Sequence, residues 1–369
     1  MDEVAVVFQR RTPYVDARLM VLRQYLKPTK VNAIAIYGDS TPSPWWNNPS
    51  ASDEWQLTGE DWRAALPAVL RPASARVVVI AGYSHPAMRG AATLARKGGA
   101  RSILMSDSTH LDRSRHAVKE WLKGRWVRRH FDAAFVSGAR AAFYVEALGI
   151  PRPRVWRGYD VVDNAHFADG ARRACQAESD HRRQMNLPDR YFLYIGRFAK
   201  EKNLVGLLDA YAAYRVRIRD GAWDLVMVGN GPETQDLKAR VDAGRIAGVH
   251  WPGAKMVDDL PAYYGLASAF ILPSTREPWG LAVNEALACG LPVLASDRCG
   301  CVPELVFPGI NGAVFDPLDP QRMAHAMTHI SNGGVDLAAM GEASRRIVAN
   351  HTTQTWAEAL GDCIRAVRS

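Results

Sequence analysis

The sequence predicts an α/β protein with two doubly wound parallel sheets that follow one another along the chain. Short apolar runs of strand length alternate with longer helical patterns through most of the 369 residues. This alternation is typical of parallel sheets that are covered by helices on both faces. The alternation lapses once, in the polar stretch 166–188, and then restarts. A chain with 48% apolar and 23% charged residues is globular, and this length is sufficient for two domains.

The interruption divides the chain into three parts. We expect residues 1–165 to form one Rossmann-like domain, and residues 166–350 to form a second Rossmann-like domain that begins with a linker at 166–188. Two helical patterns at the end have no strand after them, so 351–369 either caps the fold or packs back on the first domain. The strands predicted for the first domain are 3–9, 32–37, 76–81, 101–105 and 132–136, and its helices are about 14–26, 60–70, 85–98, 112–129 and 138–147. The strands predicted for the second are 191–195, 223–228, 248–251, 268–273, 292–295 and 312–315, and its helices are near 203–218, 232–243, 258–266, 280–289 and 318–330.

Composition argues against several classes of protein. No apolar run approaches the roughly 20 residues that span a bilayer, and the first residues begin acidic and run into a strand pattern. We therefore expect an unsecreted, cytoplasmic protein. The five cysteines lack the paired spacing of a zinc site or of a disulfide framework, so neither is expected.

The positive charge lies in the first domain. Residues 1–165 carry 24 Lys and Arg against 15 Asp and Glu, whereas the remainder carries 22 against 23. The densest basic stretch, 112–130, interleaves seven cations with Trp121 and Trp126. It is either a solvated helix face with both tryptophans packed inward, or a patch for a membrane surface or an anionic acceptor. Nucleic-acid binding is not expected, because no nucleic-acid motif accompanies the charge.

The loops after the second-domain strands carry residues suited to phosphate. Arg197 and Lys202 follow the first of these strands, five residues apart at the start of a helix. A guanidinium fork and an ammonium point charge together suit a diphosphate. Gly229 and Gly231 follow the next strand and would let the backbone approach a ligand closely. Lys255 follows the third strand and would line the same rim.

The stretch 272–290 reads as strand, loop and helix, with two carboxylates eight positions apart. Glu277 lies in the loop and Glu285 lies inside the helix. The amides of Gly280 and Leu281 begin that helix, where unpaired N–H groups attract an anion. A carboxylate such as Glu285 can accept two hydrogen bonds from the diol of a ribose, and Glu277 can accept hydrogen bonds from sugar hydroxyls. With the two cations, this pattern indicates a site for a nucleoside-diphosphate sugar.

Four segments carry a resemblance to a known family. GRFAKEKN, VGNGP, PSTREPWGLAVNEALACGLPVLAS and CVPELVFPGINGAVFDP resemble the retaining glycosyltransferases of family 4, over about residues 190–317. The Glu-x7-Glu element formed by Glu277 and Glu285 is part of that resemblance. The resemblance implies a GT-B fold, in which two Rossmann-like domains face each other across a cleft.

The resemblance also implies roles for individual residues. Arg197 and Lys202 would hold the diphosphate, and the backbone at Lys255 would contact the base. Glu285 would bind the ribose and Glu277 the transferred sugar. Enzymes of this kind need no metal, because protein cations and helix amides neutralise the leaving diphosphate. We therefore expect neither a metal nor any cofactor beside the nucleotide-sugar co-substrate.

The first domain departs from the family pattern. FQRRTPYVDAR replaces the usual glycine-rich loop after the first strand, so Arg10 or Arg11 could supply charge to the donor or form surface salt bridges, and Tyr14 lies beside them. His85 stands where relatives carry a histidine that contacts the transferred sugar, and it is either catalytic or structural. Asp107 either orients an acceptor hydroxyl or caps the following helix.

Two further segments are candidates by their length and position. The loop 41–56 is long for an α/β protein, and its adjacent Trp45 and Trp46 either stack on an acceptor or pack on a neighbouring helix. The segment 156–167 is assigned to a hinge.

The sequence thus predicts a retaining glycosyltransferase that moves a sugar from a nucleoside-diphosphate sugar to an acceptor hydroxyl. UDP is the expected nucleotide, and a glycan, a lipid-linked sugar or a small natural product is the expected acceptor. Alternatives are a nucleotide-sugar epimerase of the same fold, and a non-enzymatic protein that binds a membrane or nucleic acid through 112–130. A GT-B phosphorylase is disfavoured, because the chain is short and has no recognisable lysine pocket for pyridoxal phosphate. The sequence does not fix the base, the acceptor or the oligomeric state.

Overall fold

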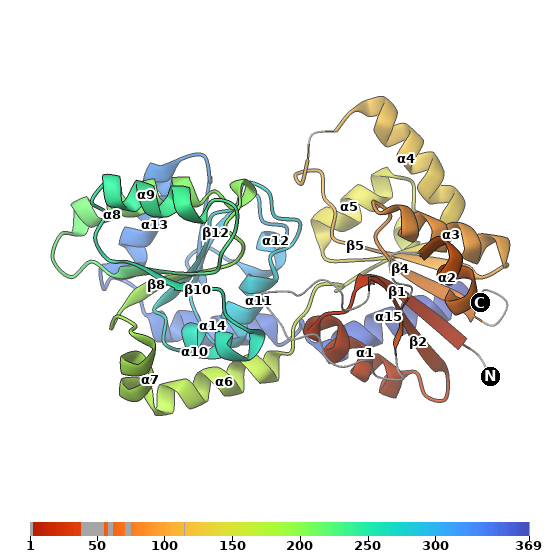
Figure 1. Cartoon of the computed structure of the whole chain (residues 1–369), viewed down its shortest axis with the longest axis horizontal. Coiled ribbons are helices and arrows are strands. Elements are labelled where there is room, and N and C mark those ends of the chain that lie inside the picture. The colour runs from red at the N-terminus through yellow and green to blue at the C-terminus, as the bar shows by residue number, and fades with distance from the viewer. Residues whose placement is uncertain (1–2, 38–54, 58–61, 71–74, 114, 369) are drawn as a thin grey trace. The chain divides into compact units, whose positions relative to one another are not determined.

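The chain folds into two compact units, each with one parallel sheet and helices packed against it (Figure 1). Unit 1 combines Met1–Asp163 with His351–Ser369, and unit 2 is Asn164–Asn350. The predicted architecture of two doubly wound α/β domains is confirmed. The computed structural model describes residues 3–37, 55–57, 62–70, 75–113 and 115–368.

The described part of unit 1 contains a seven-stranded sheet in the order β3-β2-β1-β4-β5-β6-β7, with every neighbouring pair parallel. Its strands are β1 (Glu3–Arg10), β2 (Lys30–Tyr37), β3 (Trp55–Leu57), β4 (Ala75–Ala81), β5 (Arg101–Ser106), β6 (Ala133–Val136) and β7 (Val155–Arg157). Its helices are α1 (Pro13–Tyr25), α2 (Trp62–Leu70), α3 (Pro86–Lys97), α4 (Ala117–His130), α5 (Ala139–Ala147) and α15 (Thr353–Arg368), with a short 3-10 helix η1 (Arg152–Arg154).

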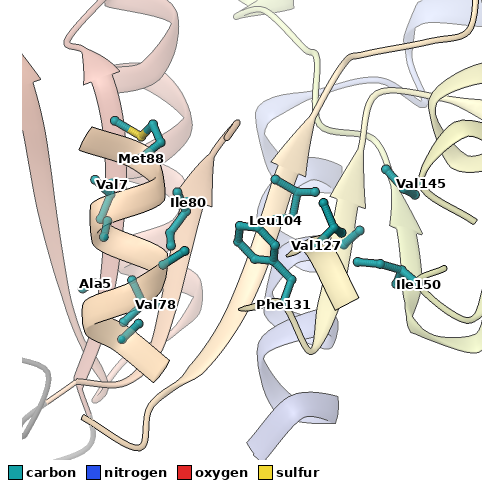
Figure 2. Close-up of a cluster of buried hydrophobic side chains, with 14 of the residues drawn as sticks. Ala5, Val7, Val78, Ile80, Met88, Leu104, Val127, Phe131, Val145 and Ile150 are labelled. Carbon is teal, nitrogen blue, oxygen red and sulfur yellow. The ribbon is translucent and has the colours of Figure 1, made fainter. Parts of the chain in front are cut away.

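Side chains of β1 alternate between two hydrophobic clusters, one on each face of the sheet. Ala5 and Val7 belong to the cluster under α2, α3, α4 and α5, part of which Figure 2 shows. Val4 and Val6 belong to the cluster under α1 and α15. Successive side chains of a strand point to opposite faces, so a strand buried on both faces must be apolar throughout.

The last helix, α15, is part of unit 1. Trp356, Leu360 and Ile364 recur every four residues, lie on one face of the helix, and are buried in the cluster that also holds α1. The Trp356 ring lies 5.9 Å from the ring of Phe135 on β6. The guanidinium of Arg18 on α1 lies 5.8 Å from the Trp356 ring centroid.

The described part of unit 2 contains a six-stranded sheet in the order β10-β9-β8-β11-β12-β13, also parallel. Its strands are β8 (Tyr191–Ile195), β9 (Asp224–Val228), β10 (Val249–Gly253), β11 (Ala269–Leu272), β12 (Val293–Ser296) and β13 (Gly312–Phe315). Its helices are α6 (Asn164–Gln176), α7 (Glu178–Met185), α8 (Leu204–Ile218), α9 (Thr234–Ala243), α10 (Leu260–Gly265), α11 (Leu281–Ala288), α12 (Val302–Leu305), α13 (Pro320–Ser331) and α14 (Leu337–Val348), with short 3-10 helices η2 (Lys200–Lys202) and η3 (Val257–Asp259).

The prediction of a linker at 166–188 is wrong, because α6 and α7 cover most of this stretch. Phe167, Ala171 and Ala174 recur at helical spacing along α6 and are buried. This narrow apolar stripe packs on α10, while most of the other side chains of α6 are polar or small. The high average polarity of the stretch concealed the stripe.

Three other boundaries differ from the prediction. The helix expected from 112 begins only at Ala117. The segment 156–167 is not simply a hinge, because it starts within β7, which pairs with β6, and ends within α6. β3 and β7 were not predicted. Each has three residues, which is too short for a recognisable periodic pattern.

Candidate functional site

The loops that follow β8 and β11 are joined by hydrogen bonds. The amides of Thr275 and Arg276 donate to the carbonyl of Glu201, over 2.9 and 3.4 Å. The Thr275 hydroxyl donates to the same carbonyl over 3.2 Å. β8 and β11 are parallel neighbours, so their carboxyl ends meet at one edge of the sheet. The loop with the predicted cations and the loop with Glu277 therefore form one structure inside unit 2.

An ion pair between Lys202 Nζ and Glu277 Oε2 links the two loops. The Ser274 hydroxyl donates to the same carboxylate oxygen over 3.0 Å. The exposed fraction is 20% for the Lys202 side chain and 11% for that of Glu277. Water and salt screen such an enclosed pair less than a pair on an open surface. The lysine predicted for phosphate and the carboxylate predicted for sugar are therefore direct neighbours.

Arg197 also has a carboxylate partner, Glu201, four residues later. Partial burial raises the pKa of Glu201, but a backbone hydrogen bond and Arg197 outweigh that effect and hold the pKa below its usual value. The Arg197 side chain is 60% exposed. Water screens an ion pair whose cation is this exposed, so the pair contributes little to stability and Arg197 can turn towards another anion at small cost.

Glu285 lies inside α11 and is only 4% exposed. The hydroxyl of Tyr264, a fully buried residue of α10, donates to Glu285 Oε2 over 2.6 Å. This bond fixes the orientation of the carboxylate. Hydrogen bonds to a charged group are among the stronger ones in proteins, so the geometry is well held.

The first turn of α11 is held in place by its neighbours. Gly280, the residue before the helix, has φ +109°, a left-handed conformation that glycine adopts readily. The Trp279 indole donates to Asn284 Oδ1 over 2.9 Å in a buried contact. The first N–H groups of a helix have no acceptor within the helix, so those at Leu281 and Ala282 lack an intrahelical partner. This end of α11 is suited to an anion.

Gly229 and Gly231 are needed by the protein itself. A Cβ at Gly229 would lie 2.0 Å from the carbonyl oxygen of Gly196, and one at Gly231 would lie 2.3 Å from that of Phe198. The Phe198 amide donates to the carbonyl of Asn230 over 2.8 Å. The sequence predicted these glycines to let the backbone approach a ligand. The structure gives a separate reason, the close approach of two loops.

Lys255 lies at the edge of the sheet. Its ammonium is 5.8 Å from the ring centroid of Tyr263 on α10. Both residues line a pocket of about 940 Å³, whose other walls come from α7, β10 and η3. Lys255 is the one residue of the predicted donor site, all of which is described, that lines this pocket. This pocket and the joined loops are therefore separate features of unit 2.

Two unit 1 candidates follow strands β4 and β5. His85 is the N-cap of α3, and its Nδ1 accepts a hydrogen bond from the amide two residues later over 3.2 Å. Asp107 cannot cap the following helix, as the sequence analysis allowed, because α4 begins ten residues later. Trp45 and Trp46 lie outside the described residues.

The basic segment after β1 divides into two kinds of residue. Arg11 forms an ion pair with Asp16 over 2.9 Å, as one of the two predicted alternatives required. Arg10 is exposed at the end of β1. Tyr14 lies in the first turn of α1, and its carbonyl accepts a hydrogen bond from Arg18 over 3.0 Å. Arg10 is thus the more accessible of the two arginines.

Sequence reasoning missed three residues that hold the candidate site together. Glu201 was recognisable, because a carboxylate between two predicted cations is expected to pair with one of them. Ser274 precedes Glu277 by three residues in the same loop. Tyr264 gave no signal in the sequence, because it lies 21 positions before Glu285 and on a different helix.

Part of the chain is similar in sequence to known glycosyltransferases. Residues 176–347 match the family model described as "Glycosyl transferases group 1". All residues predicted for donor binding lie within that segment. O-antigen chain mannosyltransferase B of Escherichia coli is 33% identical over 172 residues, which cover 45% of this chain and 44% of that protein. A GDP-mannose-dependent alpha-(1-6)-phosphatidylinositol monomannoside mannosyltransferase of Mycobacterium tuberculosis is 33% identical over 199 residues, 51% of each chain. The chain spans about half the length of these curated relatives.

Solved structures extend the likeness to the whole chain. Sucrose-phosphate synthase from Thermosynechococcus elongatus matches with a TM-score of 0.75 and 18% identity, over 100% of this chain and 99% of that one. Anabaena HepE, solved in complex with UDP and glucose, matches with a TM-score of 0.75 and 14% identity, over 99% and 100%. The chain has the GT-B fold. At these identities the likeness establishes the fold alone, and that part of the prediction is confirmed.

The close approach at Gly229 leads to a prediction about stability. We expect Gly229→Ala to lower the free energy of unfolding, because the new Cβ would collide with the Gly196 carbonyl oxygen. Gly221→Ala is the matched control, since Gly221 also has a positive φ, +79°, but no atom lies within 4 Å of the position that a Cβ would take there. The loss at Gly229 should exceed that of the control by about 1–3 kcal/mol. Urea unfolding followed by circular dichroism compares the two, and equal losses would show that the loops can separate freely.

Proposed function

We propose that this protein is a retaining glycosyltransferase that transfers a sugar from a nucleoside-diphosphate sugar to an acceptor hydroxyl. One observation carries the proposal: two cations, two carboxylates and a helix N-terminus converge at the carboxyl ends of β8 and β11. The converging residues lie in the segment that matches the glycosyl transferases group 1 model. Ligands of open α/β sheets bind at that end of the strands.

The donor would be held by its charges and its hydroxyls. Arg197 and Lys202 bind the diphosphate in this proposal, together with the amides of Gly280 and Leu281. Glu285 accepts hydrogen bonds from the ribose hydroxyls, with its second oxygen oriented by the bond that Tyr264 makes to the first. The mostly exposed Arg197 exchanges the Glu201 carboxylate for phosphate at little cost. The backbone at Lys255 contacts the base.

Transfer then proceeds with retention. The acceptor oxygen attacks the anomeric carbon on the face from which the diphosphate leaves, so one C–O bond forms as the other breaks. The acceptor proton passes to an oxygen of the leaving diphosphate. Arg197, Lys202 and the helix amides stabilise the charge that develops there. In unit 2, Glu277 holds hydroxyls of the transferred sugar. In unit 1, His85 is the candidate for a contact to that sugar, and Asp107 is the candidate that orients the acceptor.

Relatives suggest which donors to test. The mycobacterial relative is named as GDP-mannose-dependent, and Anabaena HepE was solved with UDP. We infer that UDP is the nucleotide here, and GDP is the alternative. The charge compensation comes from the protein, so transfer is expected to persist in EDTA. The acceptor is a glycan, a lipid-linked sugar or a small natural product.

Lys202→Ala tests the diphosphate site. The variant should bind UDP or GDP on the order of 100-fold more weakly and transfer sugar roughly 100- to 1,000-fold more slowly, because it removes a charge that stabilises the leaving group. Lys200→Ala is the matched control, since Lys200 is an exposed cation of the same turn. Calorimetry and a transfer assay measure both effects, with circular dichroism to check folding. Equal behaviour of the two variants would reject the assignment.

Tyr264→Phe tests the ribose site. It removes the hydroxyl that orients Glu285, so the KM for the donor should rise about 10-fold with a smaller change in kcat. The ribose is bound equally before and during transfer, which is why the effect falls on KM. Tyr214→Phe is the control. Tyr214 lies on α8, and its buried hydroxyl accepts a hydrogen bond from the Trp223 amide over 2.8 Å, so this variant also removes one buried hydroxyl. A fall in kcat alone, or the same change in Tyr214→Phe, would contradict the role.

A further inference from the structure

Helix α4 exposes large apolar side chains. Val118, Trp121 and Leu122 have exposed fractions of 72%, 62% and 54%. One of the predicted alternatives, that both tryptophans of this stretch pack inward, is wrong for Trp121. Trp126 is the one that packs, with its ring stacked on His130 at 4.2 Å between centroids.

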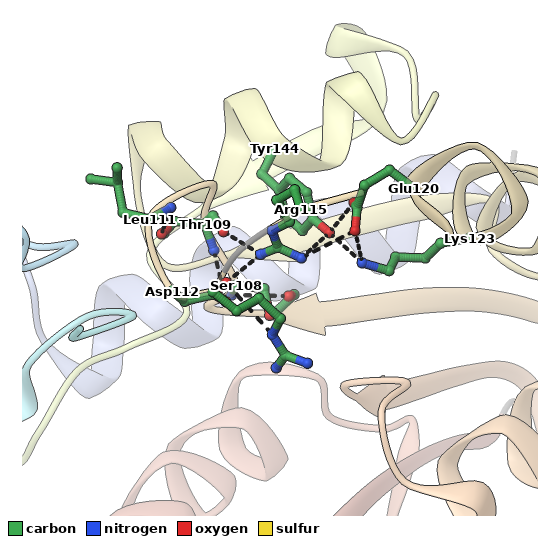
Figure 3. A network of polar contacts seen from close by, with 10 residues as sticks. Ser108, Thr109, Leu111, Asp112, Arg115, Glu120, Lys123 and Tyr144 are labelled. Atoms are coloured by element: carbon green, nitrogen blue, oxygen red, sulfur yellow. Dashed lines mark hydrogen bonds and ion pairs between the residues drawn. The ribbon is translucent and has the colours of Figure 1, made fainter. Parts of the chain in front are cut away.

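The apolar side chains of α4 point outward because polar residues of the helix occupy much of its inward face. Glu120 accepts a hydrogen bond from the Tyr144 hydroxyl over 2.6 Å and forms an ion pair with Lys123 (Figure 3). The same hydroxyl accepts from Lys123 over 2.8 Å and from Arg115 over 2.5 Å. Arg115 is also paired with Asp112. Polar bonds therefore anchor this helix to the loop before it and to α5.

The same network separates two kinds of cation in the basic stretch. Arg115 and Lys123 are neutralised by carboxylates within unit 1. Lys119, Arg125 and Arg129 are exposed, and within the described residues no ion pair joins them to a carboxylate. The charge that an outside partner meets comes from this second group.

The outward face of α4 carries apolar side chains in its first half and cationic side chains in its second half. Val118, Leu122, Arg125 and Arg129 are spaced by four, three and four residues, so they form one stripe on the helix. Trp121 lies beside the first half of the stripe. The half nearer the start of the helix is apolar and the half nearer its end is cationic.

The loop before α4 adds apolar area. Leu111 and Phe143 are exposed and line a small pocket of about 260 Å³ with His110 and Arg140. In the described part of unit 1, the large apolar side chains that are more than a third exposed are Met20, Leu111, Val118, Trp121, Leu122 and Phe143. All except Met20 belong to α4, the loop before it, or α5. Exposed apolar residues concentrated in this way mark an interaction surface.

We propose that the outward face of α4, together with Leu111 and Phe143, docks unit 1 onto an anionic lipid bilayer. Tryptophan favours the boundary between head groups and acyl chains, and exposed valine and leucine enter the same layer. Lys119, Arg125 and Arg129 attract anionic head groups. Within the described ranges, no helix is long and apolar enough to cross a membrane.

A bilayer fits these residues better than nucleic acid does. A phosphate backbone would bind the cations, but it gives no reason for aliphatic side chains in the same stripe. Aliphatic groups beside cations match the layered chemistry of a bilayer surface. The proposal is independent of the proposed transferase activity, because it concerns a surface of unit 1 that contains none of the donor residues.

Vesicle co-sedimentation tests the proposal with the full chain. We expect binding to vesicles of phosphatidylcholine mixed with phosphatidylglycerol, and little binding to phosphatidylcholine alone. The double variants Trp121→Ala/Leu122→Ala and Arg125→Ala/Arg129→Ala should each lower the apparent affinity about 10-fold or more. All four side chains are exposed, so the fold should tolerate the changes, and circular dichroism checks this.

Matched controls come from unit 2. Val216→Ala/Leu318→Ala removes exposed apolar side chains, and Arg172→Ala/Arg346→Ala removes exposed arginines. Both controls should bind vesicles like the unchanged protein. UDP and GDP binding should be the same in every variant, so failure of the membrane proposal can be told from failure of the donor site.

Three results would overturn the proposal. One is equal vesicle binding by the α4 variants and the controls. Another is that the arginine variant loses vesicle binding while the Trp121/Leu122 variant binds like the unchanged protein. The surface would then be a cationic patch that binds anions without inserting apolar side chains. The third is binding of a single-stranded oligonucleotide that depends on both pairs of residues and is tighter than binding to anionic vesicles, which would assign the surface to nucleic acid.

Discussion

The ion pair between Lys202 and Glu277 is the interaction on which the candidate site depends. It joins the loop after β8 to the loop after β11, and Ser274 adds a hydrogen bond to the same carboxylate. Each charge is partly enclosed, and an enclosed charge is costly without a partner. In the proposed function a diphosphate compensates Lys202 and sugar hydroxyls satisfy Glu277. The pair would keep both charges satisfied until the donor binds.

The surrounding fold supports this pair by backbone contacts. The carbonyl of Glu201 accepts hydrogen bonds from amides of the loop after β11. Gly229 and Gly231 let the loop after β9 lie against the loop after β8. Buried aromatic residues complete the support, since Tyr264 orients Glu285 and Trp279, in the loop before α11, donates a hydrogen bond to Asn284 of that helix. The polar residues proposed for the donor are therefore held by groups that would never touch it.

Sequence patterns predicted the fold well, because buried parallel strands are continuous apolar runs and loops at their carboxyl ends are recognisable. The patterns failed where a contact joins distant positions or where average polarity hides a stripe. Phe167 and its neighbours in α6 are an example of the second failure. The hydrogen bond between Tyr264 and Glu285 is an example of the first failure. The exposure of Trp121 is another, because contacts between α4 and α5 decide which face of α4 points outward. Both depend on which face of a helix is packed, and tertiary contacts decide that.

Amide hydrogen exchange with and without UDP or GDP tests the central claim, that the joined loops bind the nucleotide. We predict slower exchange in 196–203 and in 274–283, where the cations, Glu277 and the first turn of α11 lie. The pocket of unit 2 that Lys255 and Tyr263 line offers an internal comparison, because its walls in 181–186 and 249–252 are separate segments of the chain. Protection confined to those walls, or no protection with either nucleotide, would contradict the account.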